Sequence, residues 1–182
     1  MEIVAVWDSR DNVLNAQDGF FAEIKQGFYQ KFLGGTNQFR FLQTDIRNYW
    51  QPWKRKDDIL AFHILGRFSW GNVPLGELSD LGGAENARGY QEGRYRDNHV
   101  ITTQLEYRWQ TWDRVGLVFF VEAGDVFENF QSYNFAELKY GVGVGLRLKI
   151  VKEENLNIRF DFGLGLGHQA VENYYLDVAE AF

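Results

Sequence analysis

The sequence contains no cysteine, only two prolines and one methionine among 182 residues. Without cysteine the chain has no disulfide and no thiolate metal site, and this absence leaves the redox compartment open. Scarce proline argues against a disordered or loop-rich chain. The longest apolar runs stay below 18 residues, which excludes a transmembrane helix. Membrane-spanning strands would escape this criterion, because they carry apolar residues only at every second position.

Basic residues are outnumbered, with 19 Lys and Arg against 25 Asp and Glu and a net charge of −6. An acidic chain argues against nucleic acid as the main partner. The first residues, 1–6, carry no basic segment, so we expect no signal peptide within the sequence; the leader of an exported protein would lie outside it. The length predicts a single domain over residues 1–182.

Glycine is plentiful, at 19 residues, and aromatic residues make up 17% of the chain. This composition favours a sheet. Residues 156–167 alternate strictly, with six apolar side chains on one face and polar residues or glycines on the other. The same period-two pattern predicts further strands, clearly at 138–150, 115–123, 103–110 and 60–69, less cleanly at 19–32 and 38–50, with a last one at 173–182 and a short one at 2–7.

These segments give eight long strands, or nine with 2–7, and several are long enough to cross a bilayer at a tilt. Tryptophans gather near strand ends, as they do at membrane interfaces, and the polar faces suit a narrow filled lumen. We therefore predict an all-β fold, an antiparallel transmembrane β-barrel of about eight strands. The long loop 71–98 is expected to fold back toward the lumen, and 2–7 to be too short for a full transmembrane strand. The alternative is a soluble lipocalin-like barrel.

Charges of both signs lie on the predicted inward face, where an ion-pair network can fill the lumen of a small barrel. These inward-facing charged residues are Glu23, Lys25, Asp45, Arg47, Arg67, Glu106, Arg108, Glu122, Arg147, Lys149, Arg159 and Asp161.

The remaining chemistry is sparse. The three histidines lie far apart, so we expect no metal site and no cofactor. A catalytic triad of Ser79, Asp80 and His99 is conceivable, but nothing in the sequence orients it. We therefore expect no enzyme activity.

Three motifs together resemble the BamA/TamA/FhaC family of outer-membrane assembly factors and transporters, also called bacterial surface antigens. Residues 8–12 with Gly19 resemble the family's Asp-x-Arg-Asn turn before a strand. Residues 81–90, Leu-Gly-Gly-Ala-Glu-Asn-Ala-Arg-Gly-Tyr, resemble its loop signature, and 119–127 resemble the strand whose acid meets the loop arginine. The final Phe182 is similar to the signal that ends such barrels.

The resemblance implies a bacterial outer-membrane location, with outer-membrane lipid and other outer-membrane proteins as partners. It singles out Arg88, Gly89 and Tyr90 in the loop. Glu106 and Glu122 face the predicted lumen on adjacent strands, so both can converge on one guanidinium. We expect Arg88 to reach Glu122 first, with Glu106 as its second partner, and inward glycines to make room for the loop.

The chain departs from the family in two ways. About eight strands are predicted where the family has sixteen, and no POTRA domain is expected within the sequence. The first functional hypothesis is a minimal family member that assists insertion of other outer-membrane proteins or perturbs the membrane. The alternative is a structural or interaction barrel without insertase activity, as a homodimer whose two halves resemble one family barrel.

Overall fold

A computed structural model describes residues 1–30, 37–53, 58–151, 156–167 and 171–182. Between the strands predicted from the sequence, the connections around 34–37, 52–57, 152–155 and 168–172 fall wholly or partly outside these residues. The predicted all-β fold is confirmed. The helices of the described part, η2 (Leu75–Glu77) and η3 (Phe135–Glu137), are single 3₁₀ turns, and none could span a membrane.

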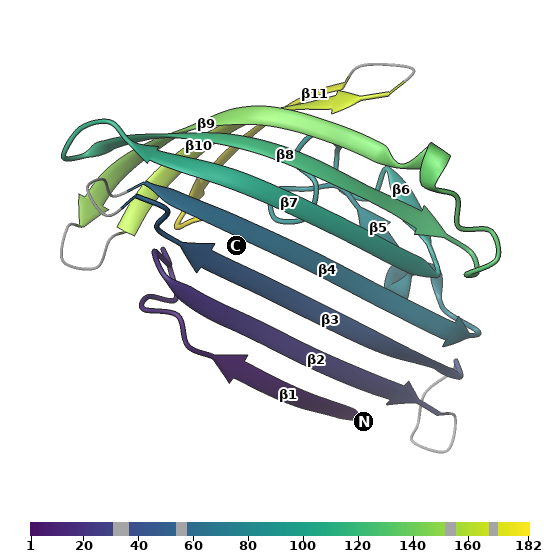
Figure 1. The fold of residues 1–182 in the computed structure, drawn as a ribbon. Helices are drawn as coiled ribbons and strands as arrows, with labels where there is room; N and C mark the ends of the chain where they lie inside the picture. Colours follow the sequence, from purple (N-terminus) through teal and green to yellow (C-terminus); the bar gives the residue numbers. More distant parts are fainter. Residues whose placement is uncertain (31–36, 54–57, 152–155, 168–170) are drawn as a thin grey trace.

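One antiparallel sheet of nine strands forms the body of the molecule (Figure 1). Every strand of this sheet pairs with the next. The loop between the fourth and fifth strands carries η2 and the short hairpin of β5 (Ser79–Leu81) and β6 (Tyr95–Asp97), and η3 lies in the loop between the sixth and seventh strands. In sheet order the nine are β1 (Glu2–Asp8), β2 (Gly19–Tyr29), β3 (Phe39–Trp50), β4 (Ile59–Gly71), β7 (His99–Gln110), β8 (Val115–Phe127), β9 (Lys139–Val151), β10 (Leu156–Leu166) and β11 (Val171–Val178).

The two faces of the sheet differ as the alternation predicts. Leu146 of β9 lies opposite Phe160 of β10 on the convex face, where both are exposed, whereas Gly145 and Asp161 lie opposite each other on the concave face. Along β10 each polar residue or glycine is buried and each apolar residue is more exposed. A face that is apolar and exposed faces lipid rather than water, which is the pattern of an outer-membrane barrel.

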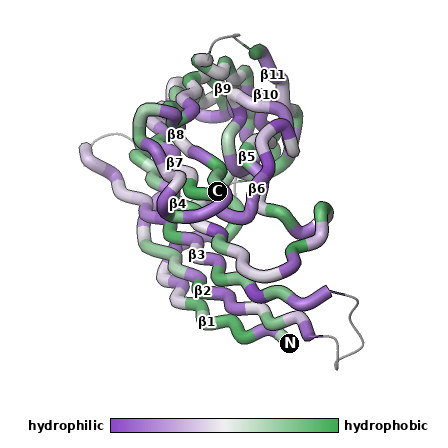
Figure 2. The backbone as a smooth tube through the Cα atoms, turned by 90° about the vertical axis from the view of Figure 1, so that its right-hand side faces the viewer, coloured by the Kyte–Doolittle hydropathy of each residue, from purple (hydrophilic) through white to green (hydrophobic). Residues whose placement is uncertain are grey.

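The sheet is curved but open, and this corrects the expected closed barrel. The strand order begins with β1 and ends with β11, so these two strands form its edges. Seen along the strands, β7–β11 curl around the β5–β6 hairpin while β1–β3 lie flatter (Figure 2). The segment expected as a short strand does join the sheet, as the seven-residue β1, paired with β2 along its whole length.

The turn between β1 and β2 is built from the Asp8–Asn12 motif. The Asp8 carboxylate accepts hydrogen bonds from Arg10 Nε at 3.0 Å and Nη2 at 2.8 Å. Gly19 follows with a φ of 112°, and a Cβ there would lie 2.5 Å from the Ser9 carbonyl oxygen. The glycine is therefore required both by its backbone conformation and by the close approach of the turn.

Candidate functional site

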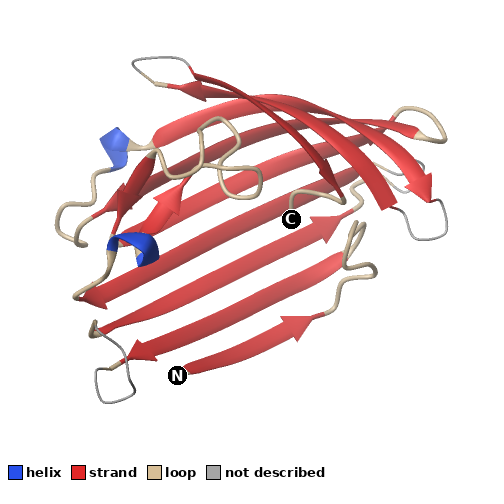
Figure 3. Cartoon of the chain, turned by 180° about the vertical axis from the view of Figure 1, so that it is seen from behind, coloured by secondary structure: helices blue, strands red, loops and turns tan. Residues whose placement is uncertain are grey.

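The long loop between β4 and β7 folds onto the concave face of the sheet (Figure 3). Gly82 and Gly83 begin its central segment with φ values of 133° and 102°, a backbone region that glycine enters without strain. The Asn86 side chain fixes the segment by donating to the Asp80 carbonyl oxygen at 2.8 Å. The loop signature is thus presented to the strands rather than to solvent.

The Arg88 guanidinium lies among buried side chains and has no exposed surface. Its Nη1 donates to Asp161 Oδ2 at 3.0 Å. Its Nη2 donates to Gln104 Oε1 at 3.3 Å and also to Glu106 Oε1. The Phe120 ring covers the guanidinium, with its centroid 3.6 Å from Cζ, which is a cation–π distance. One loop residue therefore connects β7, β8 and β10.

The Glu122 carboxylate holds the loop by binding two of the loop's backbone N–H groups. One carboxylate oxygen accepts the Arg88 N–H at 2.9 Å, and the other accepts the Gly89 N–H at 2.5 Å. The expected contact between the Arg88 guanidinium and Glu122 is thereby corrected, while Glu106 does bind the guanidinium. Two successive amides match the two oxygens of one carboxylate, so Glu122 fixes the position of the motif and leaves the guanidinium free for other acids. We call Arg88, Gln104, Glu106, Phe120, Glu122 and Asp161 the Arg88 cluster.

Tyr90 fastens the far end of the motif. Its hydroxyl donates to the Tyr140 carbonyl oxygen at 2.8 Å, and its own carbonyl accepts from the Tyr175 hydroxyl at 3.1 Å. Asn173 donates to the Gly89 carbonyl at 3.0 Å. Burial raises the pKa of the Tyr90 phenol above its ordinary value, so the hydroxyl remains a donor. The edge strand β11 thus also holds the loop.

Glycines on β10 make room for this arrangement. A Cβ at Gly163 would collide with the Arg88 carbonyl oxygen, and a Cβ at Gly165 would lie 2.6 Å from the Gly89 carbonyl oxygen. Gly89 is itself constrained, since a Cβ there would lie 2.9 Å from both Glu122 Oε1 and the Gly165 nitrogen. The inward glycines at these positions act as predicted, because any side chain would displace the loop.

An ion-pair network surrounds the Arg88 cluster. Glu106 also accepts from Arg108 Nε at 2.9 Å, and Asp161 also accepts from Arg147 Nη1 at 2.5 Å. Arg159 Nη1 lies 3.4 Å from Asp161 Oδ2. Because each carboxylate meets more than one guanidinium, the charges are shared over several strands, and undocking the loop would remove one cation from this buried network.

Three members of the cluster, Gln104, Phe120 and Asp161, were missed as partners of Arg88. The alternation places all three on the inward face, so their direction was available from the sequence. Their distance from the loop depends on the curvature of the sheet and on the register of its strands, and a period-two pattern contains no information on either.

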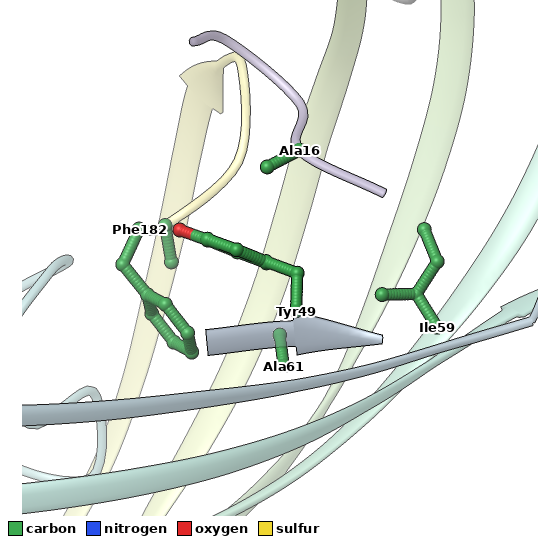
Figure 4. Close-up of a cluster of buried hydrophobic side chains, with 6 residues drawn as sticks. Ala16, Tyr49, Ile59, Ala61 and Phe182 are labelled. Carbon is green, nitrogen blue, oxygen red and sulfur yellow. The ribbon is translucent and has the colours of Figure 1, made fainter. Parts of the chain in front are cut away.

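Phe182 was expected to end the last strand, and the structure corrects this. β11 ends at Val178, and Ala179, with a φ of 72°, turns the chain inward. The Phe182 ring then stacks on the His63 ring, with 4.8 Å between the two ring centroids. It also packs in one buried cluster with Tyr49 (Figure 4). Arg108 Nη2 donates to the Phe182 carbonyl oxygen at 3.1 Å. The tail therefore lies on the concave face.

Glu180 would be an unusual residue in a membrane-spanning strand, but it lies in the inward-turning tail after β11. Its carboxylate accepts from Arg147 Nε at 2.7 Å and from the Asn157 side chain at 2.8 Å. Its N–H donates to the Leu14 carbonyl in the β1–β2 turn at 3.1 Å. The tail thus connects the last strands to the first turn across the open side of the sheet.

The other candidate residues do not assemble into a site. Ser79 Oγ donates to the carbonyls of Arg67 and Asn98, at 3.4 and 3.2 Å. His99 Nδ1 accepts the Ser69 N–H at 3.2 Å, and its ring packs among aromatic residues. Within the described ranges no three His, Asp or Glu side chains form a group that could hold a metal ion.

The family model described as the Omp85 superfamily domain matches residues 1–175. The chain belongs to the Omp85 superfamily. None of the curated proteins matches it in sequence. Among solved structures it is similar to BamA from Haemophilus ducreyi lacking POTRA domains 1-3, with a TM-score of 0.75 and 13% sequence identity. That match covers 97% of this chain and 41% of the BamA chain, so the chain spans less than half of the length of this relative.

As an Omp85 protein with a BamA-like fold, the chain belongs to the bacterial outer membrane, and its exposed apolar convex face has the pattern of a lipid-facing surface. The Omp85 sheet presents two features on which a function can rest. One is the concave face, on which the loop and the tail are packed. The other is a pair of edge strands, β1 and β11, at which the ladder of backbone hydrogen bonds stops.

Proposed function

We propose that the chain assists the insertion of other outer-membrane proteins by offering an unfinished sheet edge within the bilayer. The observation that carries this proposal is β1, an edge strand whose seven residues are all exposed. Lipid cannot hydrogen-bond a free backbone edge, and a free edge is a template for an incoming strand. A client strand that pairs there satisfies its own backbone groups as it enters the membrane.

The hydrogen-bonding direction of β1 allows a sharp test. The Ser9 N–H donates to the Phe20 carbonyl, so alternate residues of β1 bond to β2. The N–H groups of Val4 and Val6 therefore point to the free edge. Proline at Val6 removes an edge donor without removing a bond to β2, and alanine at the same position keeps the donor as a matched control.

The experiment measures the folding rate of an unfolded small barrel diluted into liposomes that contain the folded chain. We expect faster client folding than in empty liposomes, a loss of this gain with Val6→Pro, and its retention with Val6→Ala. Client folding at the rate of empty liposomes with the wild-type chain would overturn the proposal and favour the alternative, a structural barrel without insertase activity.

A further inference from the structure

The nine strands have a geometric consequence for the two edges. Every neighbouring pair in the sheet is antiparallel. With nine strands in the order β1 to β11, the first and the last run in the same direction. Any closure that joins β1 to β11 is therefore parallel, whether it occurs within one chain or between two chains.

Closure within one chain conflicts with the contents of the concave face. A barrel of about eight strands has an interior just wide enough for its own side chains. Here the concave face already holds loop backbone, with the Gly89 carbonyl within van der Waals reach of Gly165, and the tail with the Phe182 ring. A ring of nine strands would have to hold both segments in addition to its own inward side chains, which favours a closed barrel with more strands.

We propose that two copies of this chain close into one barrel, with β11 of each copy pairing in parallel with β1 of the other. A two-fold axis along the membrane normal keeps both copies in the same orientation. It makes two equivalent junctions between β11 of one copy and β1 of the other, which we call seams. Nine strands from each copy give eighteen, and barrels of 16–18 strands enclose a lumen wide enough for additional segments. The two loops and two tails then share one interior.

The two edge strands expose more apolar surface than the interior of the convex face. Leu176 of β11 is 75% exposed and Trp7 of β1 is 69% exposed, whereas Leu146 of β9 is 37% exposed. A missing neighbouring strand accounts for this difference, and the seam supplies that neighbour.

The inner face of β1 points to the same partner. Val4 and Val6 lie on the concave side, opposite Lys25 and Glu23 of β2, and both valines are exposed. An apolar pair on the lumen side of an edge strand is uncovered in one copy. In the two-copy barrel, β11 of the second copy flanks this pair and its Tyr175 shares the inward face.

A second copy occupies the same edge of β1 that a client strand would use, so the two would compete for it. The two proposals are tested separately, because pairing between copies is read by a covalent link and not by client folding. The chain has no cysteine, so every introduced thiol reports on its own position. Three outward-facing positions on each edge are suitable: Ile3, Ala5 and Trp7 on β1, and Tyr174, Leu176 and Val178 on β11.

Single-cysteine variants of β1 and of β11 are mixed, folded together in lipid and oxidised. A parallel seam links pairs with a constant difference in residue number, such as Ile3→Cys with Tyr174→Cys and Trp7→Cys with Val178→Cys. An antiparallel contact links pairs with a constant sum, such as Ile3→Cys with Val178→Cys and Trp7→Cys with Tyr174→Cys. Cysteines at Leu148 and Ile158, which are neighbours across β9 and β10, control for folding and oxidation within one chain.

We expect covalent dimers from one set of constant-difference pairs and a native mass of two chains before oxidation. Cross-links between constant-sum pairs would overturn the proposal. A single-chain mass would also overturn it, provided that the Leu148–Ile158 control link forms and so shows that the chain is folded and oxidised. A further arm places Trp7→Cys and Val178→Cys in one chain and dilutes it into an excess of cysteine-free chains. A link that stays within that chain would show self-closure and would also overturn the proposal, whatever the outcome of the client-folding assay.

Discussion

At the scale of single residues, Arg88 decides whether the loop stays on the sheet. Its guanidinium binds Glu106 and Asp161, and its backbone binds Glu122. A loop arginine normally points to water, where its removal changes little. Here the side chain is fully buried, so its loss leaves carboxylates that the remaining arginines compensate only in part.

We expect Arg88→Ala to lower the free energy of unfolding by about 3–5 kcal/mol, because removing one partner leaves buried charge uncompensated. Urea titration of the folded protein in lipid, followed by tryptophan fluorescence, measures this change. Arg94, which is exposed in the same loop, is the matched control, and Arg94→Ala should stay within about 0.5 kcal/mol. An equally small effect for Arg88→Ala would contradict the buried position of the guanidinium.

Gly165 tests the space that the loop needs. A Cβ at this position would lie 2.6 Å from the Gly89 carbonyl oxygen and 2.7 Å from the Tyr90 ring. Gly165→Ala should therefore displace the loop, cost about 1–3 kcal/mol and open the loop to trypsin at Arg88. Gly76→Ala is the control, since a Cβ there meets nothing within 4 Å. Unchanged trypsin resistance in Gly165→Ala would show that the loop does not need this space.

At the scale of strands, the period-two pattern decides which face meets lipid. Leu146 lies on the convex face of β9, opposite Phe160 and Leu117 of the adjacent strands. Leu146→Arg should cost about 2–4 kcal/mol if the position lies near the bilayer midplane, measured by folding titration in lipid. Leu75→Arg, at an exposed loop position, is the control. Full stability of Leu146→Arg in lipid would reverse the assignment of the two faces.

The tail after β11 is an element in its own right, although it has no regular secondary structure. Phe182 packs with Tyr49, Ile59 and Ala61 of β3 and β4, so Phe182→Ala removes a large buried side chain. We expect a loss of about 3–5 kcal/mol by the same titration, against little change for Phe135→Ala, whose side chain is exposed. If Phe182 acted only as a terminal insertion signal, the variant would fold more slowly and keep its stability.

At the scale of the whole molecule, the sheet has two unequal halves. β7 has buried residues at nearly every second position, whereas β2 has a single buried residue. The difference arises because the loop covers the concave side of the C-terminal strands (Figure 3). Both β2 and β7 have neighbouring strands on either side, so the contrast is independent of what joins the edges.

Hydrogen exchange should reveal these halves. Amides of β7, β8 and β10 are expected to exchange more slowly than those of β2 and β3, because local opening of the former must also undock the loop. Mass spectrometry of the detergent-folded protein measures this contrast, and Arg88→Ala should reduce it. Equal protection in β2 and β7 of the wild-type chain would show that the loop adds no stability to the strands beneath it.

The alternation was sufficient to predict the strands, their faces and the long loop. It also placed Glu106, Glu122 and the inward glycines on one face, and the family resemblance indicated Arg88 as the loop residue that meets them. It failed for the ends of the sheet. The last strand was predicted to reach Phe182, because a period-two pattern cannot register the positive φ of Ala179 at which the chain turns inward.

The sequence by itself determined the period-two pattern, the apolar convex face, the charged concave face and the family, because these follow from the order of residues along each strand. Only the tertiary structure decided that the sheet stays open, that the tail lies inside, and that Asp161 rather than Glu122 binds the Arg88 guanidinium. These outcomes depend on curvature and on contacts between residues far apart in the chain. Sequence periodicity fixes the direction of each side chain, whereas the distance between two side chains on different strands is fixed by how the whole sheet bends.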